Sequence, residues 1–254
     1  MNTFTRAFPL LAIACAGFFL ISVAPVFSQS LNPGVIRVVA VEGTVHAVTE
    51  EGRGSVSSGM TLKQGSRLIT SDASKVVLAF SNGAAVTLGP NTDLSIDEFL
   101  QGPGTSTNQP NPSSKKLGLR HGEIFGNIER LDDRSQFTVS TPIGTAGIRG
   151  TLFRISYDPL NQIARISTVD GDVVFEGIDG QTYQVPAGEE VTIRFAVRDD
   201  GTVEILDAET TRLPSAEAVR IIRELLLVMA DHLGIPIHQL PASTFEGELL
   251  SPSR

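Results

Sequence analysis

The segment from Thr141 to Asp158, TPIGTAGIRGTLFRISYD, constrains the fold of this chain more than any other part. It combines a Thr-Pro pair, three glycines close to one arginine, and an alternating run of apolar residues. The glycines Gly144, Gly147 and Gly150 predict positive φ angles, a bulge, or the close approach of another segment. Together these features are typical of a β-strand that contains a local irregularity.

The apolar residues of this segment change their spacing at its centre. They occupy even positions before Gly150, at Ala146 and Ile148, and odd positions after it, from Phe153 to Tyr157. Because successive side chains of a strand point to opposite faces, the inward face must change parity between the two runs. A β-bulge at or near Gly150 would supply the extra residue that this change requires.

Residues 141–153 are similar to the motif TP-x-x-x-x-G-x-RGT-x-F, and on this basis the chain resembles the FecR domain family. Three more stretches resemble that family and follow in its order: the glycine-bounded residues 59–70, the hairpin-like KVVLAFSNGAAVTL at 75–88, and HGEIFG at 121–126. The resemblance extends over about residues 36–192. It implies an all-β fold with a solenoid-like or distorted β-sandwich arrangement of short strands.

Short alternating runs, separated by turn residues, continue through residues 35–206, which we predict to form one FecR-like β domain. Four dipeptides between these runs favour two-residue hairpin turns, because their central positions tolerate positive φ. They are Asn82-Gly83, Asp170-Gly171, Asp179-Gly180 and Asp200-Gly201. The alternation of apolar and polar side chains with a period of two residues occurs in both solenoids and sandwiches, so the sequence is compatible with either arrangement.

The N-terminal residues 1–28 are typical of a secretory signal peptide. Arg6 is their only charge, an apolar run covers residues 7–23, and cleavage after Ser28 would leave Gln29 as the first residue. A periplasmic or secreted location is therefore predicted. Two alternatives are a lipoprotein cleavage box ending at Cys15 and an uncleaved anchor, because the run approaches the roughly 20 residues of a spanning helix. Membrane contact is expected only if the segment stays uncleaved.

Two further regions depart from the β pattern. Residues 101–116, QGPGTSTNQPNPSSKK, have almost nothing apolar to bury and are predicted to be a flexible insertion loop. Residues 214–233 have apolar side chains at helical spacing and predict one C-terminal amphipathic helix, followed by a tail over 234–254. This helix either packs against the β domain or docks into a partner.

The sequence offers no recognisable catalytic, cofactor or metal site. Its formal net charge of −8 argues against binding to nucleic acid, whose affinity rests on basic side chains. Its four histidines do not stand at metal-ligand spacing, and its paired acidic residues are neighbours that point to opposite faces or lie in turns. The GxSxG nucleophile elbow, the phosphate-binding loop and the calcium loop are all missing from the sequence. We therefore expect a protein that is not an enzyme.

The candidate structural or interaction residues lie in the opening segment: Thr141, Pro142, Gly147, Arg149, Gly150 and Thr151. Arg149 has two possible roles. In the first, Arg149 and Thr151 hold the bulge in place by hydrogen bonds inside the domain. In the second, the Arg149 guanidinium is presented to an acidic ligand or partner.

The resemblance implies a non-enzymatic protein of the cell envelope. In the best understood members, the domain carries a signal from an outer-membrane iron-siderophore receptor to a cytoplasmic sigma factor. Only six residues precede the apolar run here, so we expect no sigma-binding segment. The favoured hypothesis is an exported binding or scaffold module that contacts an envelope protein or glycan. The alternatives are an accessory to transmembrane signalling linked to transport regulation, and an envelope carbohydrate-active enzyme.

Overall fold

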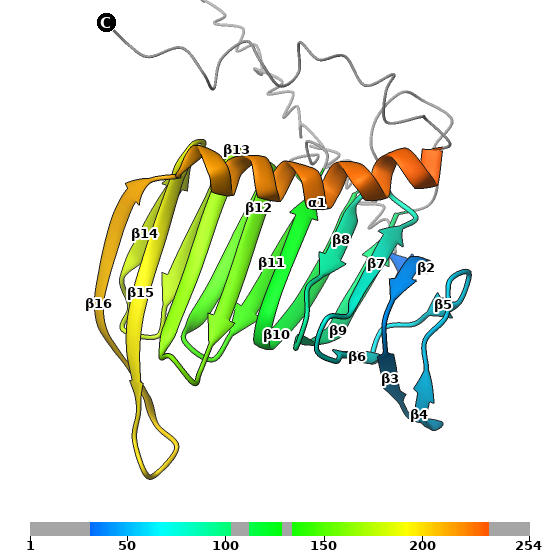
Figure 1. The fold of residues 1–254 in the computed structure, drawn as a ribbon, viewed down its shortest axis with the longest axis horizontal. Coiled ribbons are helices and arrows are strands. Elements are labelled where there is room, and N and C mark those ends of the chain that lie inside the picture. The colour runs from blue at the N-terminus through cyan, green and yellow to red at the C-terminus, as the bar shows by residue number, and fades with distance from the viewer. Residues whose placement is uncertain (1–30, 103–111, 129–133, 234–254) are drawn as a thin grey trace, which may run out of the picture.

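The computed structural model describes residues 31–102, 112–128 and 134–233 (Figure 1). The predicted signal peptide, the middle of the predicted insertion loop and the predicted tail lie outside these residues. The described elements are β1 (Asn32–Pro33), β2 (Ile36–Glu42), β3 (Val45–Thr49), β4 (Gly52–Ser55), β5 (Thr61–Leu62), β6 (Arg67–Thr70), β7 (Lys75–Phe80), β8 (Ala85–Leu88), β9 (Asp93–Gln101), β10 (Ser113–Asn127), β11 (Gln136–Thr141), β12 (Gly144–Asp158), β13 (Ile163–Gly177), β14 (Thr182–Pro186), β15 (Glu189–Val197), β16 (Val203–Arg212) and α1 (Ser215–Leu233).

The strands form two layers that share β10, β12 and β13. The helix-side layer runs in the order β16, β15, β13 (163–170), β12 (151–158), β10 (122–127), β8, β7, β2 and β5. The opposite layer runs in the order β14, β13 (172–177), β12 (144–149), β11, β10 (113–121), β9, β6, β3 and β4, and β1 pairs with β9. Among these pairings only that of β10 with β11 is parallel. The all-β prediction is confirmed.

The three shared strands each span 15 residues and bend from one layer into the other. Each bend lies at a glycine with positive φ: Gly122 at 94°, Gly150 at 55° and Gly171 at 79°. The pairing of β12 with β13 shifts register between Arg149 and Phe153, which confirms the change of parity predicted near Gly150. The fold thus combines two packed layers, as in a sandwich, with strands that pass between the layers, as in a solenoid.

The hairpin prediction at Asp170-Gly171 is wrong. This dipeptide lies inside β13, where Gly171 bends the strand, rather than between two strands. The other three dipeptides do join neighbouring antiparallel strands, namely β7 with β8, β13 with β14, and β15 with β16. A dipeptide that tolerates positive φ therefore serves here both for a turn and for a bend within one long strand.

The main hydrophobic core fills the space between the two layers. Phe153 of the helix-side layer lies against Phe137 of the opposite layer, with 6.2 Å between ring centroids. Farther along, Phe80 and Phe99 meet edge to face at 5.1 Å. All four rings are almost completely removed from solvent, so they hold the layers together through the hydrophobic effect.

Helix α1 crosses the outer surface of the helix-side layer (Figure 1). Its residues Ala218, Ile221 and Leu225 form a second buried cluster with Phe125 and Leu213. Ion pairs join the same surfaces, for example Lys75 with Glu224 at 3.0 Å. The helix therefore packs against the β domain, which was one of its two predicted roles. None of the helices in the described ranges combines the length and apolar character needed to cross a membrane.

The predicted insertion loop over 101–116 is too long at both ends. Gln101 ends β9, and β10 already begins at Ser113. Within that first part of β10 the Lys115 side chain is fully buried. Composition misled the prediction because a polar segment can still be ordered when its backbone pairs in a sheet.

Candidate functional site

The structure does not support the first of the two roles predicted for Arg149, in which it locks the bulge together with Thr151. The side chain of Arg149 is exposed and, among the described residues, makes no hydrogen bond or ion pair. The Thr151 hydroxyl is buried and has no hydrogen-bond partner within the part of the chain that the structure describes. The two side chains thus do not lock the bulge. Its shape depends on the backbone, because a Cβ on Gly171 would overlap the carbonyl oxygen of Gly150.

The other residues of the sequence motif shape the connection between β11 and β12. Thr141 Oγ1 donates a hydrogen bond to the Gly144 carbonyl at 3.1 Å and accepts one from the Ile143 amide at 3.4 Å. Pro142 lies between them in the turn. Gly147 is not required sterically, since an added Cβ would meet its nearest neighbour at an ordinary 3.7 Å. Thr141 and Pro142 thus shape the turn, and the residues of the motif do not converge on one site.

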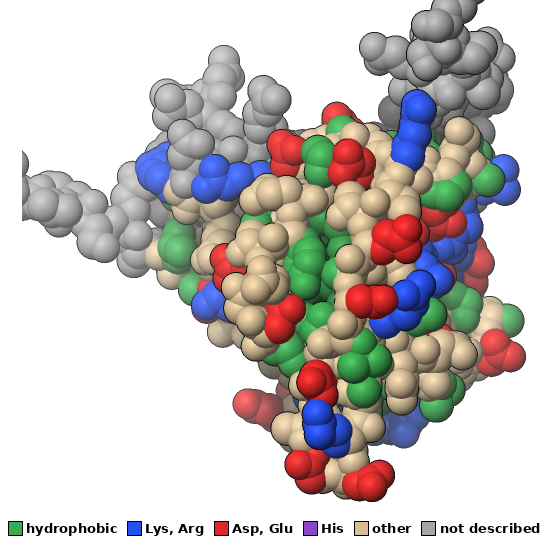
Figure 2. Space-filling view, turned by 90° about the vertical axis from the view of Figure 1, so that its left-hand side faces the viewer, with side chains coloured by type: hydrophobic (Ala, Val, Ile, Leu, Met, Phe, Trp, Pro, Cys, Tyr) green, Lys and Arg blue, Asp and Glu red, His purple; other side chains and the backbone are tan. Residues whose placement is uncertain are grey.

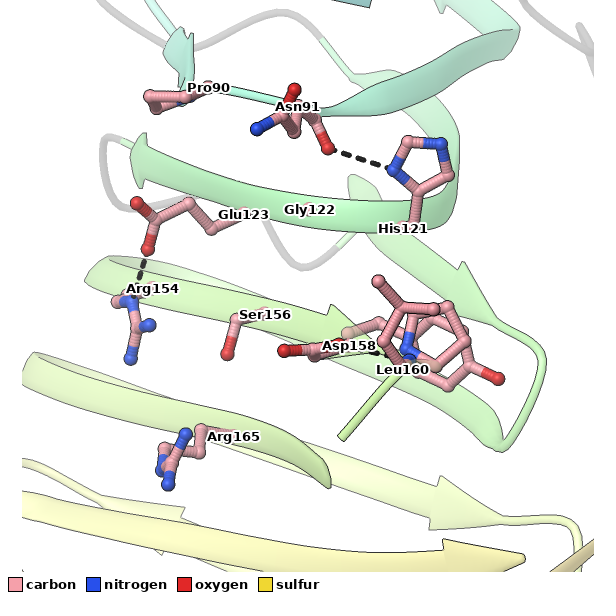
Figure 3. A pocket seen from close by; sticks show the side chains of 12 residues that line it. Pro90, Asn91, His121, Gly122, Glu123, Arg154, Ser156, Asp158, Leu160 and Arg165 are labelled. Atoms are coloured by element: carbon pink, nitrogen blue, oxygen red, sulfur yellow. Dashed lines mark hydrogen bonds and ion pairs between the residues drawn. The ribbon is translucent and has the colours of Figure 1, made fainter. Parts of the chain in front are cut away.

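A hollow of about 690 Å³ opens instead on the outer surface of the helix-side layer (Figure 3). It lies beside helix α1, because Arg154 and Glu123 on its rim form ion pairs with that helix. One wall is the turn at Pro90 and Asn91, and another is the hairpin between β12 and β13. The residues around it are Pro90, Asn91, His121, Gly122, Glu123, Arg154, Ser156, Tyr157, Asp158, Pro159, Leu160 and Arg165.

The floor of the hollow carries a polar pair. Ser156 of β12 and Arg165 of β13 are directly opposite in the antiparallel register, which places their Cβ atoms about 5 Å apart on one face. Neither side chain makes a hydrogen bond to the described residues. The Arg165 guanidinium is 41% exposed and only loosely paired, with 3.8 Å from its Nε to Glu190 Oε1. Both groups can therefore hydrogen-bond to a ligand without losing a strong partner.

The rim next to helix α1 is held by a charged network. Arg154 Nε donates to Glu123 Oε2 at 2.9 Å, and Arg220 Nη2 of the helix donates to the same oxygen at 3.1 Å. Burial alone would raise the pKa of Glu123, but these arginines outweigh burial and hold that pKa below its usual value. Arg154 also lies 3.5 Å from Glu217 of the helix. The network fixes Arg154 and keeps Glu123 ionised at neutral pH.

The rims away from the helix present an imidazole and an exposed leucine. His121 Nδ1 lies 2.8 Å from the Asn91 carbonyl, so this nitrogen carries the proton and donates. Asp158 closes the hairpin by accepting hydrogen bonds from the Leu160 and Asn161 amides at 3.0 and 3.1 Å. The side chain of Leu160 is 93% exposed at the tip. The hollow thus combines free polar groups with one apolar contact point.

This arrangement is suited to binding. Arg165, Ser156 and the His121 ring supply hydrogen-bonding groups, and Leu160 supplies apolar surface for a partner. Within residues 31–102, 112–128 and 134–233, no three histidine, cysteine or acidic side chains are grouped as a metal site.

Sequence reasoning missed these residues, although part of the signal was present. Arg154 and Ser156 alternate with the apolar residues of β12, so both belong to its outer face. The turn that follows Asp158 fixes the register that brings Arg165 opposite Ser156. Glu123 and Arg220 are 97 residues apart, and no local pattern joins them.

The described residues form an all-β, two-layer domain that is open at its ends and covered by one helix. Residues 66–174 match the family model described as FecR protein, so the chain contains a FecR domain. This confirms the resemblance inferred from the Arg-Gly-Thr segment. All the residues that line the hollow lie inside the matched region.

Two crystal structures of proteins proposed to be anti-sigma factors, both from Parabacteroides distasonis ATCC 8503, are similar to the chain. The first is 14% identical with a TM-score of 0.43, and the alignment covers 58% of this chain and 59% of that one. The second is 12% identical with a TM-score of 0.46, and the alignment covers 66% of this chain and 74% of that one. The chain thus spans about three fifths of the first structure. No curated protein matches the sequence.

Proposed function

We propose that the protein is an exported, non-enzymatic FecR-type binding module of the cell envelope, which holds a partner at the hollow beside helix α1. The observation that carries this proposal is the position of the hollow inside the FecR match, with Arg165 and Ser156 free to bind. The signal-like residues 1–28 support export to the periplasm or beyond.

A protein partner is favoured over a glycan. Sugar rings are commonly held against exposed aromatic faces, but the chain contains no tryptophan. Tyr157, which borders the hollow, is 3% exposed and stacks on Phe195 with 4.9 Å between ring centroids. The 93% exposed Leu160 offers the kind of apolar anchor that a protein loop can cover.

Affinity capture from envelope extracts tests this proposal with two matched variants. Arg165→Glu reverses the charge on the floor of the hollow, and Arg53→Glu reverses an exposed arginine of β4, far from the hollow. The wild type and Arg53→Glu should recover the same partner, whereas Arg165→Glu should recover about tenfold less. Arg53→Glu should unfold at the wild-type temperature, because its side chain is exposed. Arg165→Glu also loses the loose pair with Glu190, whose side chain is only 12% exposed, so recovery is compared at a temperature at which circular dichroism shows all three proteins to be folded.

Equal recovery of the partner by all three proteins would count against the hollow as the binding site. Turnover of an envelope polysaccharide by the purified protein would establish an enzyme instead. Export has a separate test: N-terminal sequencing of the protein from the periplasmic fraction should begin at Gln29, and retention of the intact N-terminus in the membrane would favour an anchor.

A further inference from the structure

The two layers end together at β14 and β16, and this end of the molecule is open (Figures 1 and 2). Within the described residues, β16 pairs only with β15, and β14 pairs only with β13. Figure 2 looks onto this end and shows an apolar strip flanked by acidic side chains. Partly exposed side chains that pack against the core lie here: Tyr183, Val203, Ile205 and Ala208.

The part of the chain that includes the open end has a large excess of acidic over basic residues. Residues 170–212 contain eleven acidic and three basic residues, against a formal net charge of −8 for the whole chain. On β16, Asp207 pairs with Arg194 of β15, and Glu204 pairs with Arg198, which follows the end of β15. Glu209 is exposed and has no ion pair among the described residues. A partner for this surface should therefore be basic.

The backbone of β16 offers a place for another strand. It is ten residues long, and in an antiparallel ladder every second residue directs its N–H and C=O groups away from the neighbouring strand. Such an unpaired edge is a template for an extended segment of another chain. Leu206, displaced by a bulge in the pairing with β15, adds an apolar side chain that is 61% exposed.

We propose that this end binds an extended, basic segment of a protein partner, which adds as a strand to β16. Side chains of β16 alternate between the inner group Val203, Ile205 and Ala208 and an acidic outer group. The added strand would therefore alternate apolar residues, which continue the inner group, with lysines or arginines beside the acidic group. A second copy is a poor occupant, because its own β16 would bring acidic side chains against acidic side chains. The surface lies outside the FecR match and is separate from the hollow.

The probe is a ten-residue peptide of alternating lysine and valine or threonine, measured against the purified protein by isothermal titration calorimetry. A second peptide keeps the lysines and replaces two central apolar residues with proline, which removes backbone donors. Strand addition predicts that the proline peptide binds about tenfold more weakly. Equal binding of the two peptides would show attraction by charge alone and would overturn the proposal.

Two protein variants locate the site. Glu209→Lys should weaken the peptide about fivefold or more, because it replaces an attraction by a repulsion. Glu50→Lys, an exposed glutamate at the opposite end of the fold, should leave binding unchanged. Equal effects of the two variants would refute the assignment to β16. Absence of binding by the wild type, or its self-association through this end in sedimentation experiments, would refute the basic strand as the occupant.

Discussion

Lys115 is buried without a counter-ion, and replacing it should stabilise the protein. Its side chain is fully removed from solvent between Phe99 and Phe137, with the Nζ atom 5.7 and 5.5 Å from their ring centroids. Its hydrogen bond is donated to Ser113 Oγ at 3.2 Å. No carboxylate of the described residues pairs with it. Burial lowers the pKa of Lys115 from 10.5 to about 8.

The size of the effect follows from that pKa change. In the unfolded chain Lys115 keeps its ordinary pKa, so the folded state holds the proton less strongly by about 3 kcal/mol. Lys115→Met removes the charge, retains an unbranched apolar side chain, and gives up the bond to Ser113, which is worth about 1 kcal/mol. We therefore expect the free energy of unfolding at pH 7 to rise by about 2 kcal/mol.

Urea denaturation at a series of pH values measures this effect. Because the folded pKa lies below the unfolded one, the penalty is full below about pH 8 and disappears as pH rises toward 10.5. The advantage of Lys115→Met should therefore shrink over the same range. Lys116→Met is the control, since that side chain is 50% exposed and pairs with Glu98 at 3.3 Å. A Lys115→Met protein that is less stable than wild type at pH 7 would refute the reasoning.

Three further predictions concern the bulge, the helix and the charged rim. Gly171→Ala should lower the free energy of unfolding by about 1–3 kcal/mol in chemical denaturation, because its Cβ would overlap the Gly150 carbonyl. Arg149→Ala should change the free energy of unfolding by less than about 0.5 kcal/mol. A large loss of stability in Arg149→Ala would restore the anchoring role of that arginine. Ile221→Asp should lower the melting temperature by about 6 °C or more, since it places a charge in the buried cluster with Phe125. Val219→Asp, at a 47% exposed position of the same helix, should have little effect on the melting temperature. Equal losses in the two variants would contradict the packing of α1 against the β domain. The lowered pKa of Glu123 stabilises the fold at pH values above the ordinary carboxyl pKa, and this stability is lost as pH falls through the folded pKa. Glu123→Gln should therefore make the free energy of unfolding less dependent on pH on the acid side. An unchanged pH dependence would argue against the charged network of Glu123 with Arg154 and Arg220.

The sequence predicted the fold class through local chemistry. The change of parity around Gly150 could be read from apolar spacing alone, because a strand obeys a period of two wherever one face is buried. The bend at Gly171 could not be distinguished from a hairpin turn, since both need positive φ at the same kind of dipeptide. The length of β13 depends on its partners in two layers, which the dipeptide does not specify.

The candidate site was harder to predict than the fold. Arg149 stands between conspicuous glycines, yet the bend leaves its side chain in solvent. Arg165 and Ser156 attract no notice in the sequence and meet only through the register of β12 and β13. Lys115 lies in a stretch whose polar composition suggests a loop, and pairing of β10 with β9 draws it inside. In each case the position of the side chain in the folded protein decides its role, and the local sequence suggests a different role.

The role of the hollow as the binding site can be tested most directly by photo-crosslinking in intact cells of the encoding organism. A photoreactive amino acid at Leu160, on the rim of the hollow, should give a covalent adduct with one envelope protein, and the adduct should disappear when Arg165→Glu is added. The same probe at Glu50, at the far end of the fold, should give no such adduct. An adduct from Leu160 that persists with Arg165→Glu, or none at all, would contradict the proposed role of the hollow.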